Sequence, residues 1–170
     1  MALGRRGEEA MAKALEALPP SWLVLHSLPI GSQGADIDHL VVGPRGVFSI
    51  NAKNHGQKPI RIKENDVTVG GSRVHHARNS RFEASRVGTI LSQACGFEIK
   101  ARGIVAFTSS GVITDLGQPV DGKVRLMAIA DVVPWLLAQP AELPPRWLAA
   151  VQDTARHART WETSRPVDVA

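Results

Sequence analysis

The sequence predicts a mixed α/β domain, a β-sheet flanked by helices, and three stretches of the chain carry this prediction. "GRRGEEAMAKALEALPP" has the spacing of an amphipathic helix, and "ADIDHLVVGPRGVFSINAK" has two apolar strands around a Gly and Pro cluster. "ARNSRFEASRVGTILSQACG" again has helical spacing, and a short apolar strand follows it. Because a chain of 170 residues has the length of one domain, we expect a single domain over residues 1–170.

The first 34 residues predict a helix, a strand and a turn. The helix carries Glu8 and Glu9 in its first turn and stops at Pro19-Pro20, where it can no longer continue. "SWLVLHSLPI", at 21–30, is a β-rich apolar run, and "GSQG", at 31–34, has the composition of a turn.

The middle of the chain predicts two hairpins and a helix. The first hairpin spans 35–53 and turns at "GPRG", and "KPIRIKENDVTVGG" is expected to extend the same sheet by another hairpin. A helix over 77–96 is expected to lie on the sheet, capped by Asn79 or Ser80, with Glu83 near its first turn. Its apolar residues, at mixed three- and four-residue spacing, are Phe82, Val87, Ile90, Leu91 and Ala94.

The C-terminal part predicts two more strands and two more helices. "ARGIVAFTSS" is typical of a buried strand, "KVRLMAIADVVPWLLAQP" of a strand that leads into a helix, and "LPPRWLAAVQDTARHARTWET" of a last helix. Trp135, Trp147 and Trp161 have Leu, Val and Ala neighbours, which favours core and helix-docking roles over a base-stacking platform.

Composition excludes some classes of protein and permits others. The formal net charge of +4 permits a polyanionic partner without requiring one, and the basic residues concentrate between Lys53 and Arg86. No apolar run has membrane-spanning length and no secretory signal is evident, so we expect a cytoplasmic protein with no membrane partner. One cysteine excludes an internal disulfide, and no Cys or His spacing indicates zinc.

The first hairpin predicts the place of the chemistry. Side chains alternate between the faces of a strand, so Asp38 near the start of one strand can converge with Asn51 and Lys53 at the end of the next. A carboxylate beside a lysine suits phosphodiester hydrolysis, because the acid can hold Mg²⁺ while the ammonium positions water and offsets negative charge. Two aspartates and a lysine alone favour solvated turn and surface residues over a catalytic site. The charges here lie directly beside apolar strand residues, which favours the site.

The stretches "GRRGEEAMAKALEAL", "GADIDHLVVGPRGVFSINAKNH" and "RNSRFEASR", in this order, resemble the nuclease-related domain family, NERD, which is similar to PD-(D/E)XK restriction-endonuclease-like nucleases. The resemblance covers about residues 4–110, and the strand and helices over 120–163 are expected to complete the core. It implies a restriction-endonuclease-like mixed sheet flanked by helices, with extra C-terminal helices. It also implies Mg²⁺, for which Mn²⁺ can substitute, and DNA as the substrate.

The resemblance also implies roles for particular residues. Glu9 corresponds to the acid of the family's first helix, with Glu8 as the alternative register, and Asp38 corresponds to the metal-binding aspartate. Lys53 corresponds to the motif lysine, and the carbonyl of Ala52 to the customary backbone ligand. The weaker candidate Asp36 is either a second ligand or the capped end of a strand.

Asn51 is where the sequence departs from the family pattern, which has Asp or Glu two residues before the lysine. An amide offers one neutral oxygen to Mg²⁺ and binds it less well than a carboxylate does. Three outcomes stay open: Asn51 is a weak ligand, another carboxylate substitutes for it, or catalysis has been lost. Glu83 is the substitute candidate, with a solvated acid in a first helical turn as the other interpretation.

Other residues near the motif have secondary roles in this hypothesis. His39 should face away from Asp38 as a core histidine, whereas His55 is a candidate for phosphate contact or an auxiliary base, if it is not a plain loop residue. Arg78 and Arg81 are candidates for contacts with the DNA backbone.

The leading functional hypothesis is therefore a Mg²⁺-dependent DNA endonuclease or nicking enzyme. The first alternative is a catalytically weakened DNA-binding module of the same fold, for which Asn51 is the chief argument. The second alternative is a protein-interaction domain, with a homo-oligomer or a protein partner held through the C-terminal helices.

Overall fold

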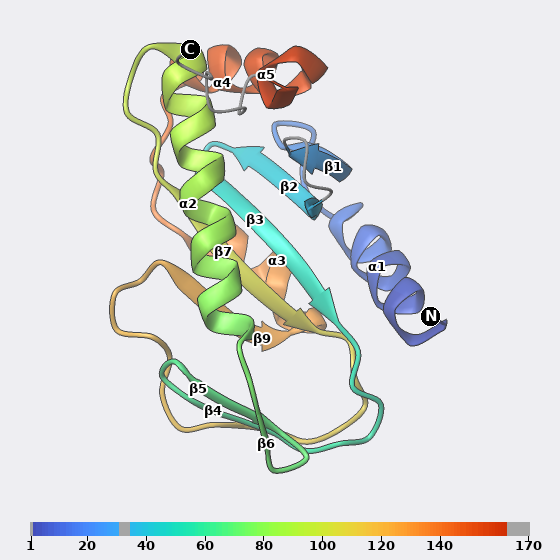
Figure 1. Cartoon of the computed structure of the whole chain (residues 1–170). Helices are drawn as coiled ribbons and strands as arrows, with labels where there is room; N and C mark the ends of the chain where they lie inside the picture. Colours follow the sequence, from blue (N-terminus) through green and yellow to red (C-terminus); the bar gives the residue numbers. More distant parts are fainter. Residues whose placement is uncertain (1, 31–34, 163–170) are drawn as a thin grey trace, which may run out of the picture.

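The computed structural model describes residues 2–30 and 35–162 (Figure 1). In chain order, the helices and strands are α1 (Ala2–Leu15), β1 (Leu23–Ile30), β2 (Ala35–Gly43), β3 (Gly46–Lys53), β4 (Ile60–Lys63), β5 (Asp66–Val69), β6 (Ser72–Val74), α2 (His76–Cys95), β7 (Ala101–Phe107), β8 (Ile113–Asp115), β9 (Val124–Ala128), α3 (Ile129–Ala138), α4 (Pro145–Arg156) and α5 (Ala158–Glu162). The turn predicted at 31–34 lies outside the described residues. This mixed α/β architecture with helices at its C-terminal end confirms the predicted fold class.

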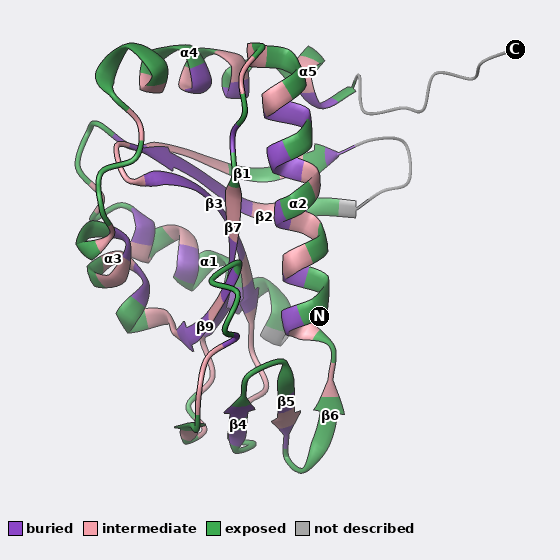
Figure 2. Ribbon diagram, turned by 90° about the vertical axis from the view of Figure 1, so that its left-hand side faces the viewer, coloured by how far each residue is buried: buried purple, intermediate pink, exposed green. Residues whose placement is uncertain are grey.

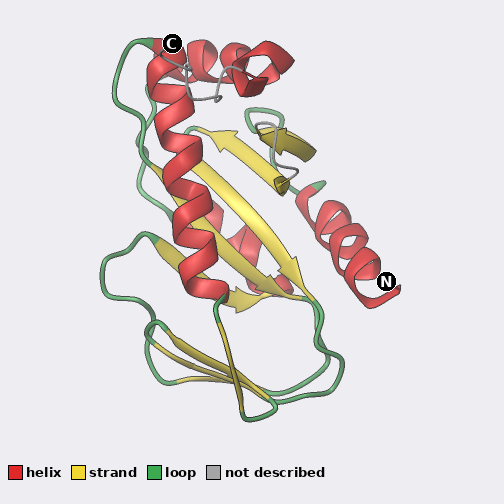
Figure 3. Ribbon diagram, viewed as in Figure 1, coloured by secondary structure: helices red, strands yellow, loops and turns green. Residues whose placement is uncertain are grey.

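A mixed sheet forms the centre of the described residues, with the strand order β1-β2-β3-β7-β9. β1, β2 and β3 are antiparallel neighbours, whereas β3, β7 and β9 run parallel. The predicted hairpin is confirmed, since Gly43 pairs with Gly46 across the turn at Pro44 and Arg45. The parallel strands β3 and β7 are joined through α2, which Figure 3 shows lying across the sheet.

Helices cover both faces of this sheet and bury its apolar side chains (Figure 2). On one face, Met11 and Leu15 of α1 pack with Phe48, Ile50 and residues of α3. The other face packs against α2, α4 and α5; the buried residues of this second cluster include Leu40, Val42, Val47, Val87, Leu91, Val151 and Trp161. The predicted site residues at the end of β3 therefore rest on strands that are packed from both sides.

The second predicted hairpin exists, but the expectation that it extends the first sheet is wrong. β4 and β5 pair as an antiparallel hairpin, and together with β6 and β8 they form a separate sheet of order β6-β5-β4-β8. The reason is the pairing of β4 with Ile113–Asp115, a short strand that the sequence pattern did not indicate. Ile60, Ile62, Val67 and Val69 are buried against Val105, Phe107 and Leu126 of the large sheet.

Three details of the helices differ from the predictions. α2 begins at His76, without a side-chain hydrogen bond at its N-cap, so neither Asn79 nor Ser80 caps it and Glu83 lies beyond the first turn. Phe82 is 67% exposed and Ala94 is exposed, although both were assigned to the buried stripe. The last helix is two helices, separated at His157. Of the tryptophans, Trp161 is buried, whereas Trp147 remains 40% exposed and packs on Phe97.

A close contact between Ser80 and Gly103 sets the distance of α2 from the sheet. Ser80 is 2% exposed, and a Cβ on Gly103 would lie 2.2 Å from its Oγ and 2.9 Å from its carbonyl oxygen. β7 can approach the helix this closely only because residue 103 has no side chain. Ser80 lies about one turn before Glu83 on the same helix, so the contact also sets how near Glu83 comes to β3.

None of the helices in the described ranges combines the length and the apolar character that a membrane crossing requires.

Candidate active site

The hairpin brings the acidic start of β2 beside the polar end of β3. The side chain of Asp38 accepts a hydrogen bond from the backbone N–H of Ala52, with 3.2 Å between Oδ2 and N. Ala52 is the residue between Asn51 and Lys53, so the bond anchors the Asp38 carboxylate beside both of them. The expected convergence of Asp38, Asn51 and Lys53 follows from this register, in which His39 pairs with Ile50.

α2 brings a second carboxylate to the same place. The amide Nδ2 of Asn51 donates a hydrogen bond to Oε2 of Glu83 over 3.1 Å. The other carboxylate oxygen, Oε1, is buried and has no hydrogen-bond partner among the described residues. Asn51, which lacks the expected negative charge, is therefore in direct contact with an acid from a different element.

The charge of Asp38 affects the protonation of Glu83. Burial, reinforced by the negative charge of Asp38, raises the pKa of Glu83 to about 7, against the opposing effects of the Asn51 hydrogen bond and the cations Lys53 and Arg86. Burial also raises the pKa of Asp38, which the Ala52 N–H and Lys53 partly offset. Protonation of one carboxylate relieves the repulsion between them, and a divalent cation does so while both groups stay ionised.

α1 adds Glu8 to this group, and not Glu9. Glu8 raises the pKa of Asp38 through its charge and a side-chain hydrogen bond. Glu9 is exposed and pairs with Arg5 one turn earlier, with 3.1 Å between Nε and Oε1. The geometry therefore favours Glu8 as the acid of the first helix, which the sequence indicated only as the alternative to Glu9. The buried Met11, three residues after Glu8, is the signal that could have indicated it.

A pair of histidines borders the site on the side of Lys53. The Nε2 atoms of His55 and His76 lie 2.9 Å apart, and the rings stack with 5.1 Å between their centroids. Burial and the positive charge of Lys53 lower the pKa of His76 to about 4 and also lower that of His55. The backbone N–H of His55 donates to Ser109 Oγ over 2.6 Å, which holds the loop after β3 in place. The partner of His55, an uncharged imidazole from the start of α2, was not part of the predicted site.

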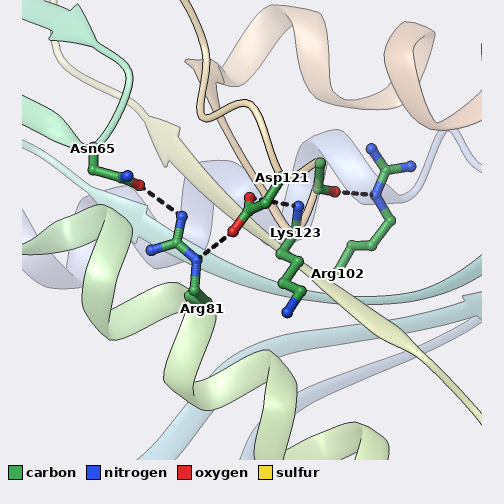
Figure 4. A network of polar contacts seen from close by, with 6 residues as sticks. Asn65, Arg81, Arg102, Asp121 and Lys123 are labelled. Atoms are coloured by element: carbon green, nitrogen blue, oxygen red, sulfur yellow. Dashed lines mark hydrogen bonds and ion pairs between the residues drawn. The ribbon is translucent and has the colours of Figure 1, made fainter.

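Several predicted residues do not join this group. Asp36 is exposed, opposite Pro29 of β1. His39 is a buried core residue, as predicted, with 2.8 Å between its Nδ1 and that of His26. Arg81 donates to Asp121 over 2.9 Å and to Asn65 over 2.6 Å (Figure 4). These bonds occupy the guanidinium of Arg81 within the protein and leave it poorly placed to contact a phosphate.

The donors present fit a hard divalent cation in their chemistry. Glu8, Asp38 and Glu83 are carboxylates, Asn51 has a side-chain carbonyl oxygen, and Oε1 of Glu83 is an unpaired buried acceptor. Within the described ranges, no three His, Cys, Asp or Glu side chains already stand in a complete metal-binding arrangement. A cation at this site would be held by these carboxylates together with Asn51, the backbone and water.

A scan against protein-family models finds the nuclease-related domain over residues 3–108, more than half of the chain. The chain belongs to the NERD family. The matched part of the NERD domain runs from α1 to the end of β7 and includes Glu8, Asp38, Asn51, Lys53 and Glu83. Family membership confirms the resemblance and makes a nuclease-related function the coarse assignment. Comparison with curated proteins and with solved structures found no match.

Proposed function

We propose that this NERD domain is a metal-dependent nuclease that hydrolyses phosphodiester bonds of DNA at the end of β3. The observation that carries the proposal is the hydrogen bond between Asn51 and Glu83. It supports the idea that Glu83 supplies, from α2, the negative charge that Asn51 lacks. Asp38 and Lys53 then complete an acid, acid and lysine arrangement around one point.

Mg²⁺, or Mn²⁺ in its place, would be held by Asp38 and Glu83, with the oxygen of Asn51 and the carbonyl of Ala52 as neutral ligands. Glu8 is the candidate for a further acidic ligand. When bound, the ion would polarise the scissile phosphate and make a water molecule more acidic. Oε1 of Glu83, which has no partner in the described structure, supports this role because a buried acceptor without a bond is costly.

Lys53 is the proposed positive group beside the phosphate. Its charge acts on the pKa values of Asp38, Glu83, His55 and His76, which supports a position of its ammonium group near these side chains. There it can orient a water molecule and offset the negative charge that develops on the phosphate oxygens. The neutral pair His55 and His76 borders the same centre, and one of its imidazoles can accept a hydrogen bond from a water molecule or a phosphate hydroxyl.

The direct test is cleavage of supercoiled plasmid DNA with Mg²⁺ or Mn²⁺. We expect nicked or linear product from the wild-type protein, and a loss of about 100-fold or more in Asp38→Asn, Glu83→Gln and Lys53→Met. Glu9→Gln is the matched control, because Glu9 neighbours Glu8 but pairs with Arg5 on the surface. Full activity in both Asp38→Asn and Glu83→Gln would rule out the proposed site.

One alternative is favoured by the neutral side chain of Asn51, namely a domain of this fold that holds DNA without cutting it. Retention of the plasmid without cleavage under both metals would support this binding module. The absence of both binding and cleavage would instead favour a protein-interaction domain.

A further inference from the structure

Phe82 is an aromatic residue on the outside of α2. Its side chain is 67% exposed, while the buried residues of the helix are Ala77, Ser80, Ala84, Val87, Gly88, Ile90 and Leu91. Phe82 therefore contributes little to the packing of α2 on the sheet. A single exposed apolar side chain is common on protein surfaces, so the neighbours of Phe82 on the helix decide what it can do.

Two arginines flank Phe82 on the same face of the helix. Arg78 precedes it by four residues and Arg86 follows it by four, a spacing that aligns side chains along one side of a helix at intervals of about 6 Å. Neither guanidinium forms a salt bridge within the described part of the chain. Arg81, by contrast, is bound to Asp121 and Asn65. The row Arg78, Phe82 and Arg86 thus presents an exposed aromatic ring between an exposed arginine, Arg78, and a half-buried one, Arg86.

This row borders the candidate active site. Glu83 directly follows Phe82 along α2, and its carboxylate accepts a hydrogen bond from Asn51 of β3 over 3.1 Å. A chain bound along the row would therefore pass close to Glu83 and the end of β3.

The chemistry of the row fits a single strand better than a duplex. An exposed aromatic ring can stack on a base whose face is free, and this face is covered inside a double helix. Arginines on either side can bind the flanking phosphates.

We propose that Arg78, Phe82 and Arg86 form a binding surface for single-stranded DNA, with a base stacked on Phe82 and a phosphate on each arginine. This inference rests on the proposed nuclease function and narrows its substrate to DNA with unpaired bases next to the cleaved bond.

The test measures the affinity for a fluorescently labelled oligothymidylate by anisotropy, in EDTA so that no cleavage occurs. Phe82→Leu keeps an apolar side chain but removes the π face, and we expect it to weaken binding by about tenfold or more. Phe82→Trp should bind within about twofold of the wild type, because indole also stacks. Val120→Ala is the matched surface control, since Val120 is 85% exposed and lies outside α2. Equal thermal unfolding temperatures verify that all variants fold.

Two further ligands distinguish stacking from general attraction. An oligonucleotide of abasic sites keeps the phosphates but has no bases, so we expect it to bind Phe82→Leu and wild-type protein equally. A blunt duplex should likewise show little difference between them. Equal oligothymidylate affinity in wild-type protein and Phe82→Leu would overturn the proposal, as would a Phe82→Leu change that alters only self-association or protein binding.

Plasmid and oligonucleotide cleavage separate this inference from the proposed function. If Glu83→Gln abolishes cleavage while Phe82→Leu leaves single-strand binding and cleavage unchanged, the nuclease function stands and the stacking surface is rejected. If Phe82 controls single-strand binding but no metal supports cleavage, the binding surface stands and the assignment of a cleaved substrate is rejected.

Discussion

The amide of Asn51 donates a hydrogen bond to Glu83 across 3.1 Å, which joins the end of β3 to α2 at the centre of the candidate site. The contact places a neutral residue and an acid where the family pattern has an acid on the strand. If the negative charge of this pair matters more than whether β3 or α2 carries it, moving the carboxylate to position 51 and the amide to position 83 should preserve cleavage. The double variant Asn51→Asp/Glu83→Gln tests this directly.

We expect the double variant to retain metal-dependent cleavage within about tenfold of the wild type, whereas Glu83→Gln alone should lose about 100-fold or more. Plasmid nicking rates at saturating Mn²⁺ give the comparison. Asn51→Asp alone concentrates negative charge beside Glu83 and should lower the unfolding temperature in EDTA, and added Mn²⁺ should reverse this loss. A double variant as inactive as Glu83→Gln would contradict the idea of an exchangeable acid.

The raised pKa of Glu83 makes stability depend on pH. Its value is about 7 in the folded protein against an ordinary 4.5, so the folded state holds the proton more tightly. The free energy of unfolding should therefore fall as pH rises from about 4.5 to about 7, and the loss should persist at higher pH. Glu83→Gln removes this titration, and we expect it to stabilise the metal-free protein near pH 8 by on the order of 2–3 kcal/mol, with little effect near pH 4.

Urea unfolding in EDTA at the two pH values measures this difference. The control is Glu98→Gln, since Glu98 is an exposed acid whose nearest described cation, Lys100, is 3.9 Å away. A stabilisation by Glu83→Gln that is the same at both pH values would show that Glu83 does not titrate as the structure indicates.

Glu8 and Glu9 should differ sharply although they are neighbours. Glu8 acts on Asp38, whereas Glu9 is held by Arg5 on the surface. We expect Glu8→Gln to weaken Mn²⁺ activation of cleavage by about tenfold, and Glu9→Gln to change it by less than about twofold. A titration of the cleavage rate with Mn²⁺ measures both effects. A larger loss of Mn²⁺ activation in Glu9→Gln than in Glu8→Gln would show instead that Glu9 is the acid of the first helix.

Arg78 and Arg81 should likewise differ in their effect on DNA. Arg78 is exposed, whereas Arg81 is bound to Asp121 and Asn65 (Figure 4). We expect Arg78→Ala to weaken DNA binding several-fold and to reduce the slope of log affinity against log salt by about one. Arg81→Ala should leave that slope unchanged. Anisotropy at several salt concentrations measures it, and equal slopes in the two variants would contradict the assignment.

Gly103 should be intolerant of a side chain. In Gly103→Ala the added Cβ meets Ser80, so α2 must move away from β7 and carry Glu83 with it. We expect a loss of about 1–3 kcal/mol in the free energy of unfolding, together with reduced cleavage. Gly4→Ala is the control, because nothing lies within 4 Å of its Cβ position and helix α1 gains from alanine. Equal unfolding free energies in the two variants would show that the contact is not tight.

Local sequence patterns were sufficient to predict most of the helices and strands, and the part of the candidate site that lies on the first hairpin. The hairpin of β2 and β3 was predictable because its strands alternate and its turn has Gly and Pro, and the hairpin by itself brings Asp38 to Ala52. The second sheet was not predictable, because β4 pairs with three residues about 50 positions further along the chain.

The sequence by itself determined which chemical groups are available, where the main helices and strands lie, and that Asp38 and Lys53 flank one hairpin, because these features depend on residue types and short-range periodicity. Only the tertiary structure decided that Glu8 rather than Glu9 faces Asp38, that Glu83 meets Asn51, and that Arg81 is occupied. Those outcomes depend on how α1 and α2 are rotated and docked on the sheet. Contacts between residues distant in sequence, such as that of Ser80 with Gly103, determine this docking.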